Sequence, residues 1–169
     1  KNRILEAYQL SPEAGVLTQD SCYFGYKNQF GNRWIYATAN DSLGTILVRQ
    51  FRLLNSWSEC DTLPQRVNQF TEQNSPYWLS DGVTLYFSSN HPDGLGGLDI
   101  YVTRYNTGSE TYTIPENLGM PFNTPGNDFL YVLDEVKGIG YWATDWEAGE
   151  DSVRVYQFES TEPLLWTTE

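Results

Sequence analysis

Short runs of aromatic and β-branched residues, separated by segments rich in glycine, proline and aspartate, make up most of the chain. In residues 85–105, LYFSSNHPDGLGGLDIYVTRY, an aromatic run is followed by a glycine-rich turn and a second β-rich run. Two such runs around a compact turn are typical of a β-hairpin. We expect Gly94, Gly96 and Gly97 to turn the chain through positive φ, and Asp99 to accept hydrogen bonds from backbone N–H groups of the turn.

The same pattern of two runs occurs three times along the chain. The first run of each hairpin begins at Ile35, Tyr86 or Tyr141. The second runs span residues 45–51, 99–105 and 152–158. Three copies in order, about 50 residues apart, indicate a repeat architecture.

The similarity extends outside the hairpins. Residues 74–82 correspond to residues 127–135, which aligns Asp81 with Asp134, and Gly82 follows Asp81 in the turn between two strands. Each copy then has three or four short strands. This predicts a β-propeller rather than a β-sandwich.

We therefore predict an all-β chain, β-propeller-like, with about three four-stranded antiparallel blades forming a partial propeller. The blades are expected near residues 16–70, 71–124 and 125–169, and residues 1–15 form an N-terminal extension. Propellers usually close with about four to eight blades, so three blades leave open faces. We favour a longer native protein over pairing of two chains or capping by residues 1–15, and we expect this chain to self-associate through its open blade faces.

The charge of the chain excludes some partners. The sequence has 22 acidic and 10 basic residues, a net charge of −12, without a basic cluster. Binding to nucleic acid is therefore disfavoured. No apolar run approaches the roughly 20 residues of a membrane-spanning helix.

The two cysteines, Cys22 and Cys60, do not have the spacing of a metal or redox motif. Two separate reduced thiols are the favoured interpretation. A disulfide between them stays open, and depends on the fold and on an oxidising compartment.

Candidate catalytic and metal sites are few. The segment around Asp93 and Asp99 resembles a calcium loop only in part, because its equivalents lie about 50 residues away rather than in tandem. His91 is the single histidine, and no nucleophile motif accompanies it. We therefore expect no metal, no cofactor and no enzymatic activity.

Acidic and aromatic residues keep two binding hypotheses open. Asp81 and Asp134 are candidate binding residues, and paired carboxylates also make a carbohydrate-hydrolysing propeller the alternative function. Trp146, in the turn TDWEAGED, is the best candidate for an exposed aromatic contact, and it serves equally well as edge packing.

The segment WLSDGVTLYFSSNHPDGLGGLDIYVTRYN, followed by PENLGMPFNTPGND, resembles the WD40-like propeller repeat of the TolB type found in exported proteins of the bacterial envelope. Some members of that group carry an OmpA-like peptidoglycan-binding domain. The usual proline between Ser80 and Asp81 is missing here. The matching residues are Ser80, Asp81, Gly82, Tyr86, Phe87, Ser89, Gly96, Gly97, Asp99, Ile100, Tyr101, Pro115, Asn117, Leu118, Gly119, Pro121, Asn123 and Thr124.

The resemblance implies a propeller fold in which most of the motif residues are structural, including Asp81, Gly82 and Asp99. It also implies an exported protein, periplasmic or associated with the envelope. The expected function is a non-enzymatic scaffold or binding module for a protein or a cell-wall glycan.

Overall fold

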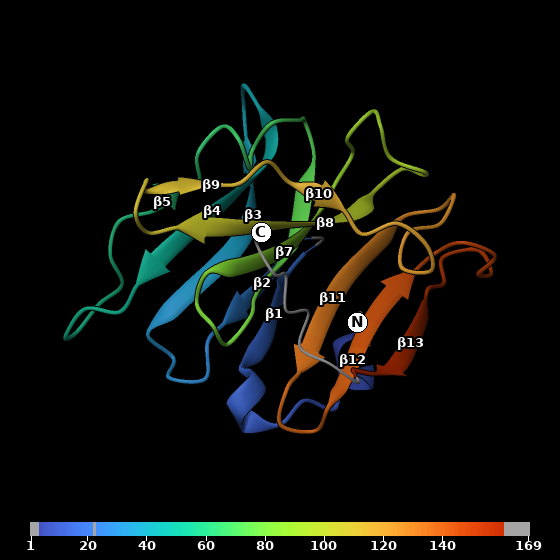
Figure 1. Cartoon of the computed structure of the whole chain (residues 1–169), viewed down its shortest axis with the longest axis horizontal. Helices are drawn as coiled ribbons and strands as arrows, with labels where there is room; N and C mark the ends of the chain where they lie inside the picture. Colours follow the sequence, from blue (N-terminus) through green and yellow to red (C-terminus); the bar gives the residue numbers. More distant parts are fainter. Residues whose placement is uncertain (1–3, 22, 161–169) are drawn as a thin grey trace.

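The computed structural model describes residues 4–21 and 23–160, which form three antiparallel β-sheets in chain order (Figure 1). The described residues contain no α-helix, and their only helical turns are the 3₁₀ helices η1 (Ile4–Ala7) and η2 (Pro12–Ala14). The prediction of an all-β chain is confirmed. No sheet closes on itself.

Each sheet is built around one of the hairpins expected from the sequence. The first sheet has the order β1 (Val16–Asp20), β2 (Tyr23–Lys27), β3 (Arg33–Asn40), β4 (Gly44–Phe51) and β5 (Asp61–Thr62). The second has β6 (Gln73–Trp78), β7 (Thr84–Ser89), β8 (Asp99–Asn106) and β10 (Glu116–Asn117), with β9 (Thr111–Tyr112) on the far end of β8. The third has β11 (Asp128–Asp134), β12 (Ile139–Thr144) and β13 (Arg154–Glu159).

The three central hairpins share one register. Ala37 pairs with Leu47 in the first sheet, Ser88 with Ile100 in the second, and Ala143 with Val155 in the third. The strands before these hairpins are also alike. β6 and β11 each contain a bulge with one residue at positive φ, Ser75 at 52° and Leu130 at 55°.

A buried asparagine pins each linker to the sheet before it. The first linker is residues 63–72, between β5 and β6, and the second is residues 118–127, between β10 and β11. The Oδ1 atom of Asn68 accepts a hydrogen bond from Leu47 N (2.8 Å), and its Nδ2 atom donates to Leu47 O (3.0 Å).

Asn123 makes the same pair of bonds to the backbone of Ile100, at 2.7 and 3.0 Å. Each amide therefore replaces one residue of a neighbouring strand, and satisfies a buried N–H and C=O that would otherwise lack partners. Asn68 and Asn123 occupy equivalent places in the two linkers.

One glycine of each hairpin turn lies against the following linker. A Cβ atom on Gly44 would sit 2.1 Å from Thr71 O, and one on Gly96 would sit 2.1 Å from Gly126 O. Gly44 has φ 82°, but Gly96 is not in the left-handed region.

The expectation of positive φ at Gly96 or Gly97 is therefore wrong, and Gly94 also lacks it. Glycine is needed in this turn because the linker approaches the backbone closely. A Cβ on Gly97 would lie 2.3 Å from the Oδ1 atom of Asn127, for example. At Gly96 and Gly97, contact with the second linker excludes a side chain, and the backbone dihedral does not.

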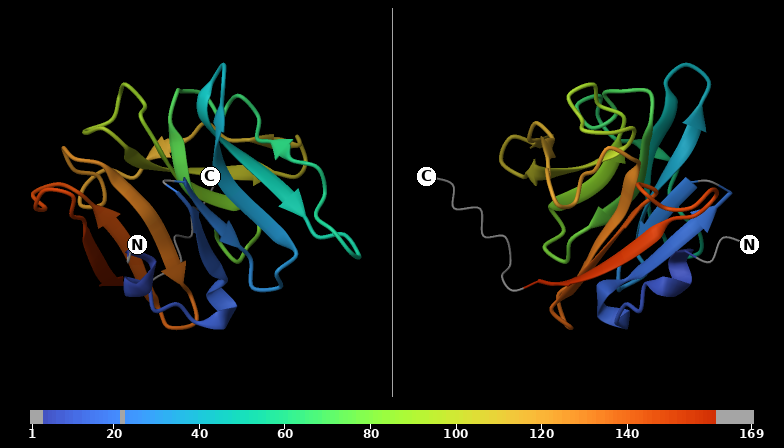
Figure 2. Two further views of the ribbon diagram at one scale, coloured as in Figure 1. Left: turned by 180° about the vertical axis from the view of Figure 1, so that it is seen from behind. Right: turned by 90° about the vertical axis from the view of Figure 1, so that its right-hand side faces the viewer.

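The N-terminal residues pack on the third sheet. Tyr8 is buried, its ring lies 5.2 Å from that of Tyr141 on β12, and its hydroxyl donates to Leu130 O (3.0 Å). Figure 2 (left) shows this segment lying across β11 and β12. The chain then crosses to the first sheet, where it enters β1.

The strands that precede the three hairpins, β2, β6 and β11, meet in the interior. β6 contacts both β2 and β11. Tyr77 on β6 packs edge-on against Tyr26 of β2 (4.7 Å between ring centroids) and donates its hydroxyl to Leu133 O of β11 (2.6 Å). Burial raises the pKa of Tyr77, so its hydroxyl stays protonated as the donor. One side chain thus connects all three sheets.

The asparagine clamps predict that replacing the asparagine lowers the unfolding free energy by a similar amount in the two linkers. Replacing Asn68 or Asn123 with Ala leaves a buried N–H and C=O without partners, so each change should lower the unfolding free energy by about 2–4 kcal/mol. Urea unfolding followed by tryptophan fluorescence measures this. Gln65→Ala in the first linker is the control, because its exposed side chain makes no described hydrogen bond, and it should change stability by less than about 0.5 kcal/mol. Equal stability of Asn68→Ala and the control would contradict the clamp.

Candidate functional site

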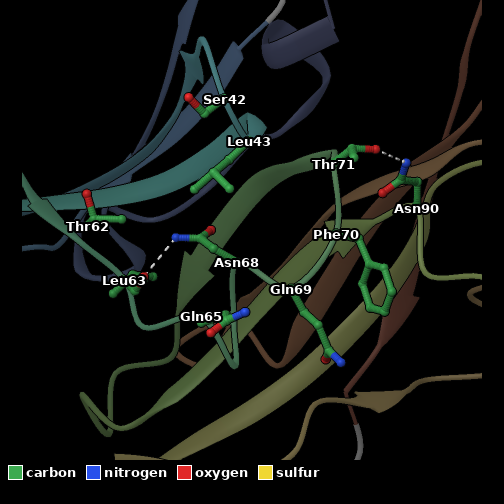
Figure 3. Close-up of a pocket in the computed structure, with 10 residues that line it drawn as sticks. All are labelled: Ser42, Leu43, Thr62, Leu63, Gln65, Asn68, Gln69, Phe70, Thr71 and Asn90. Atoms are coloured by element: carbon green, nitrogen blue, oxygen red, sulfur yellow. Dashed lines mark hydrogen bonds between the residues drawn. The ribbon is translucent and has the colours of Figure 1, made fainter.

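A hollow lies where the first linker passes between the first and second sheets (Figure 3). Its volume is ≈ 580 Å³, within the usual size of ligand pockets. We call it the linker groove. Its lining residues are Ser42, Leu43, Thr62, Leu63, Gln65, Asn68, Gln69, Phe70, Thr71 and Asn90.

The groove is bordered by an unusually short turn. The β3–β4 turn consists of residues 41–43, and Asn40 Oδ1 caps it by accepting hydrogen bonds from Ser42 N and Leu43 N. The corresponding β7–β8 turn consists of residues 90–98 and lies against the second linker. The first junction between sheets therefore has less turn to cover its linker than the second.

The lining of the groove combines polar and apolar side chains and contains no charged residue. The side chains of Gln65 and Gln69 are exposed and make no hydrogen bond with the described part of the chain. Thr71 and Asn90 are joined across the groove by a hydrogen bond of 2.9 Å (Figure 3). Free amides and hydroxyls suit the recognition of neutral hydroxyl or amide groups.

An uncharged lining also limits the chemistry of the groove. General acid–base and glycosidase mechanisms need carboxylates or comparable titratable groups within hydrogen-bonding reach of the substrate. None of the lining residues carries such a group.

His91 lies beside this groove rather than in it. Its ring packs edge-on against Phe70, with 4.2 Å between centroids, and is 5.5 Å from the ring of Tyr101. Its Nδ1 atom accepts a hydrogen bond from Asp93 N (3.0 Å). The side chain is therefore used in packing the β7–β8 turn against the first linker.

Asp99 holds the corner of that turn. Its carboxylate accepts hydrogen bonds from Leu95 N (2.7 Å), Gly96 N (3.0 Å) and Asn117 Nδ2 (2.8 Å). Asp93, which the sequence placed in the same loop, has a side chain that is 90% exposed. Within residues 4–21 and 23–160, no group of three His, Cys, Asp or Glu side chains is arranged to hold a metal ion.

Asp81 closes its own turn between β6 and β7. It accepts hydrogen bonds from Val83 N (2.9 Å), Thr84 N (2.8 Å) and Thr84 Oγ1 (2.6 Å), and Gly82 beside it has φ 71°. It also borders a second hollow of ≈ 360 Å³, which Arg33 and other residues line.

Asp134 is buried at the end of β11 and fixes the N-terminal segment. It accepts hydrogen bonds from Ser11 N (2.6 Å), Ser11 Oγ (2.7 Å) and Lys137 N (3.1 Å). Burial alone raises the pKa of this carboxyl, but the hydrogen bonds from Ser11 and Lys137 outweigh burial and hold the pKa below its usual range.

Trp146 lies in the β12–β13 turn and is 42% exposed. Its backbone N donates to Thr144 Oγ1 (3.1 Å), and its Cβ packs close to Gly126 of the second linker. Trp146, Asp81 and Asp134 come from three different turns, and none of them lines the linker groove. Binding at these three residues stays a prediction.

Sequence reasoning missed the groove because its residues are ordinary amides and hydroxyls in the weakly repeated first copy. Its one available signal was the similarity between residues 63–70 and 115–123. Of the two cysteines, Cys22 is outside the described residues, so their pairing stays untested. Cys60 has an exposed free thiol, with its Sγ atom 2.9 Å from the hydroxyl of Tyr36.

A scan against models of known protein families finds no match to this chain, and a search of curated proteins finds none either. None of the helices in the described ranges has the length and apolar character that crossing a bilayer requires.

The Asp99 corner can be separated from a metal site by calorimetry. Asp99→Ala removes three hydrogen bonds from a buried corner and should lower the unfolding free energy by about 2–4 kcal/mol, seen as a lower Tm. Asp93→Ala, at an exposed position in the same turn, should leave Tm nearly unchanged. Calcium should not alter Tm of the unmodified protein. A calcium-dependent rise in Tm that disappears in Asp99→Ala would mean that this turn is a metal site.

The lowered pKa of Asp134 predicts a specific acid dependence. A carboxyl whose pKa is lower in the folded than in the unfolded state stabilises the fold above its unfolded pKa, about 3.9, and loses this contribution as the pH falls through its folded pKa. Asp134→Asn should therefore be less stable than the unmodified protein by about 1–3 kcal/mol at neutral pH, with a smaller difference at about pH 3.

Urea unfolding at both pH values measures the acid dependence, with the exposed Asp41→Asn as the control. A stability difference between Asp134→Asn and the unmodified protein that is the same at both pH values would show that the Asp134 charge does not stabilise the N-terminal contact.

Proposed function

We propose that the three sheets are successive blades of a β-propeller arc. The support is the likeness of the two junctions between sheets. Besides the asparagine clamps, Glu72 N donates to Asn90 Oδ1 (3.0 Å) in the first junction, and Asn127 N donates to Asp145 Oδ1 (2.7 Å) at the equivalent place in the second. Like contacts at successive junctions are expected in a propeller, whose blades are generated by repeating one rotation.

We propose further that this arc is a non-catalytic binding module and that the linker groove binds a neutral glycan. The observation that carries this proposal is the uncharged lining, in which the side-chain amides of Gln65 and Gln69 have no partner in the described chain. Glycan hydroxyl and acetamido groups both donate and accept hydrogen bonds, as amide side chains do. Leu43 and Phe70 supply the apolar surface of the groove.

The resemblance to the TolB-type repeat supports an exported, envelope-associated protein, in which the neutral glycan is a cell-wall polymer. A protein partner is also expected from the resemblance, but the amides and hydroxyls of the uncharged groove favour the glycan at this site.

The hydrolytic alternative is less well supported. A glycosidase needs two carboxylates on either side of the scissile bond. Asp81 and Asp134 lie outside the linker groove, and each accepts three hydrogen bonds from neighbouring protein groups. Their geometry stabilises turns.

The test is isothermal titration calorimetry with chitohexaose, a soluble neutral oligomer of N-acetylglucosamine, followed by pull-down with insoluble peptidoglycan. Gln65→Ala and Gln69→Ala should each weaken binding by about tenfold, because each removes hydrogen bonds to the ligand. Gln157→Ala, an exposed amide of β13 outside the groove, is the matched control and should bind like the unmodified protein.

Absence of binding to both probes, or equal binding by the Gln69→Ala and Gln157→Ala variants, would overturn the glycan proposal. Release of shorter oligomers from chitohexaose during prolonged incubation would show hydrolysis and overturn the non-catalytic assignment.

A further inference from the structure

Each sheet has two faces with different neighbours. We call the face that holds Tyr36, Phe87 or Trp142 the leading face, and the opposite face, with Ile35, Tyr86 or Tyr141, the trailing face. These residues are consecutive in β3, β7 and β12, so their side chains point to opposite sides of the sheet.

The leading faces of the second and third sheets are each covered by the sheet or linker that precedes them in the chain. Phe87 lies in a small hollow with Val67 of the first linker, and Trp142 packs edge-on against Phe122 of the second linker (5.3 Å between centroids). On the other side, Tyr86 packs against Tyr131 of the third sheet (4.7 Å). At the junction between the second and third sheets, a leading face therefore receives a trailing face.

The leading face of the first sheet has no such cover. The ring contacts of Trp34 are with Tyr36 (4.3 Å) and Trp57 (5.8 Å), both from the first sheet and the segment that follows β4. All three side chains are half-buried. Val16 on β1 is 58% exposed at the same face, because it pairs with Lys27, which pairs with Trp34.

Two cations lie on this aromatic surface. Lys27 Nζ is 4.6 Å from the ring centroid of Trp34 and 5.5 Å from that of Trp57, and the Arg52 guanidinium is 5.6 Å from Trp57. Neither cation has a carboxylate within 4.0 Å in the described part of the chain. Unpaired cations on one face are notable in a chain with 22 acidic and 10 basic residues.

The opposite end of the arc exposes two carboxylates. The N-terminal segment covers the trailing face of the third sheet and exposes Glu6. Glu159 is exposed on the same face, since it pairs with Ile139, two residues from Tyr141. Neither carboxylate forms an ion pair with the described residues. Lys137, a cation of this end within residues 4–21 and 23–160, donates to Gln9 O (2.5 Å).

We propose that the leading face of the first sheet binds a second copy of this chain, through the acidic trailing end of that copy. In this contact the N-terminal segment that covers the trailing face lies at the interface, and Lys27 and Arg52 lie opposite Glu6 and Glu159. Such a contact is heterologous: it closes into a ring when the rotation allows, and two copies would supply six sheets, within the roughly four to eight blades of propellers. The proposal rests on the proposed propeller arc and does not depend on glycan binding.

Charge reversal and mixing test this contact. Sedimentation velocity at micromolar concentrations should show self-association of the unmodified chain. Lys27→Glu with Arg52→Glu, and separately Glu6→Lys with Glu159→Lys, should each weaken it by at least about tenfold, because like charges then face each other. An equimolar mixture of the two double variants should restore association, since each variant retains one unchanged end and the two changed ends again carry opposite charges.

Arg33→Glu with Arg154→Glu is the matched control, because it makes the same change in net charge at exposed residues off this face and should leave association unchanged. Circular dichroism verifies that each variant folds, and Glu159→Lys alone replaces the double variant at the acidic end if that one unfolds. A monomer at all concentrations, or an equal loss in the control, would overturn the proposal, as would failure of the mixture to associate. None of these outcomes bears on chitohexaose binding.

Discussion

The fold depends on the buried side-chain amides of Asn68 and Asn123. Each lies in a linker, where the backbone has left the sheet. There it cannot form strand-pairing hydrogen bonds with the N–H and C=O groups of β4 or β8. By accepting from and donating to one backbone residue, Leu47 or Ile100, the amide fixes the distance and angle at which the next sheet begins. Both clamps use the same side-chain atoms, so this contact is common to the two junctions.

The repeated strands could be predicted from the sequence because the same pattern of aromatic and β-branched residues occurs three times. As that pattern indicated, the first strands of the three hairpins contain Ile35, Tyr86 and Tyr141. The Asp99 corner was also foreseen as a backbone acceptor. The role of the glycines was not, since sequence alone does not distinguish a residue that needs positive φ from one pressed against a distant segment such as residues 124–126.

The groove could not be predicted for a related reason. It results from a difference in turn length, three residues between β3 and β4 against nine between β7 and β8, and from a linker that lies beside the shorter turn only in the fold. Gln65 and Gln69 carry no signature of binding in the sequence. The sequence-based candidates were instead chosen by charge and size, and Asp81 and Asp134 are engaged in turns.

The two junctions differ most at one buried polar position. Gln73 pairs with Ser89 at the start of β6, and Asp128 pairs with Thr144 at the start of β11. Burial raises the pKa of Asp128 even though hydrogen bonds from Thr124 and Thr144 oppose this effect. Burying this carboxylate therefore costs free energy, but the carboxylate has hydrogen-bond partners.

The fully buried amide of Gln73 has no hydrogen-bond partner in the described chain. A buried amide without partners costs about 1–3 kcal/mol. The junction that bears this cost is also the one with the shorter turn and the open groove. The unsatisfied amide and the open groove therefore occur together at the first junction.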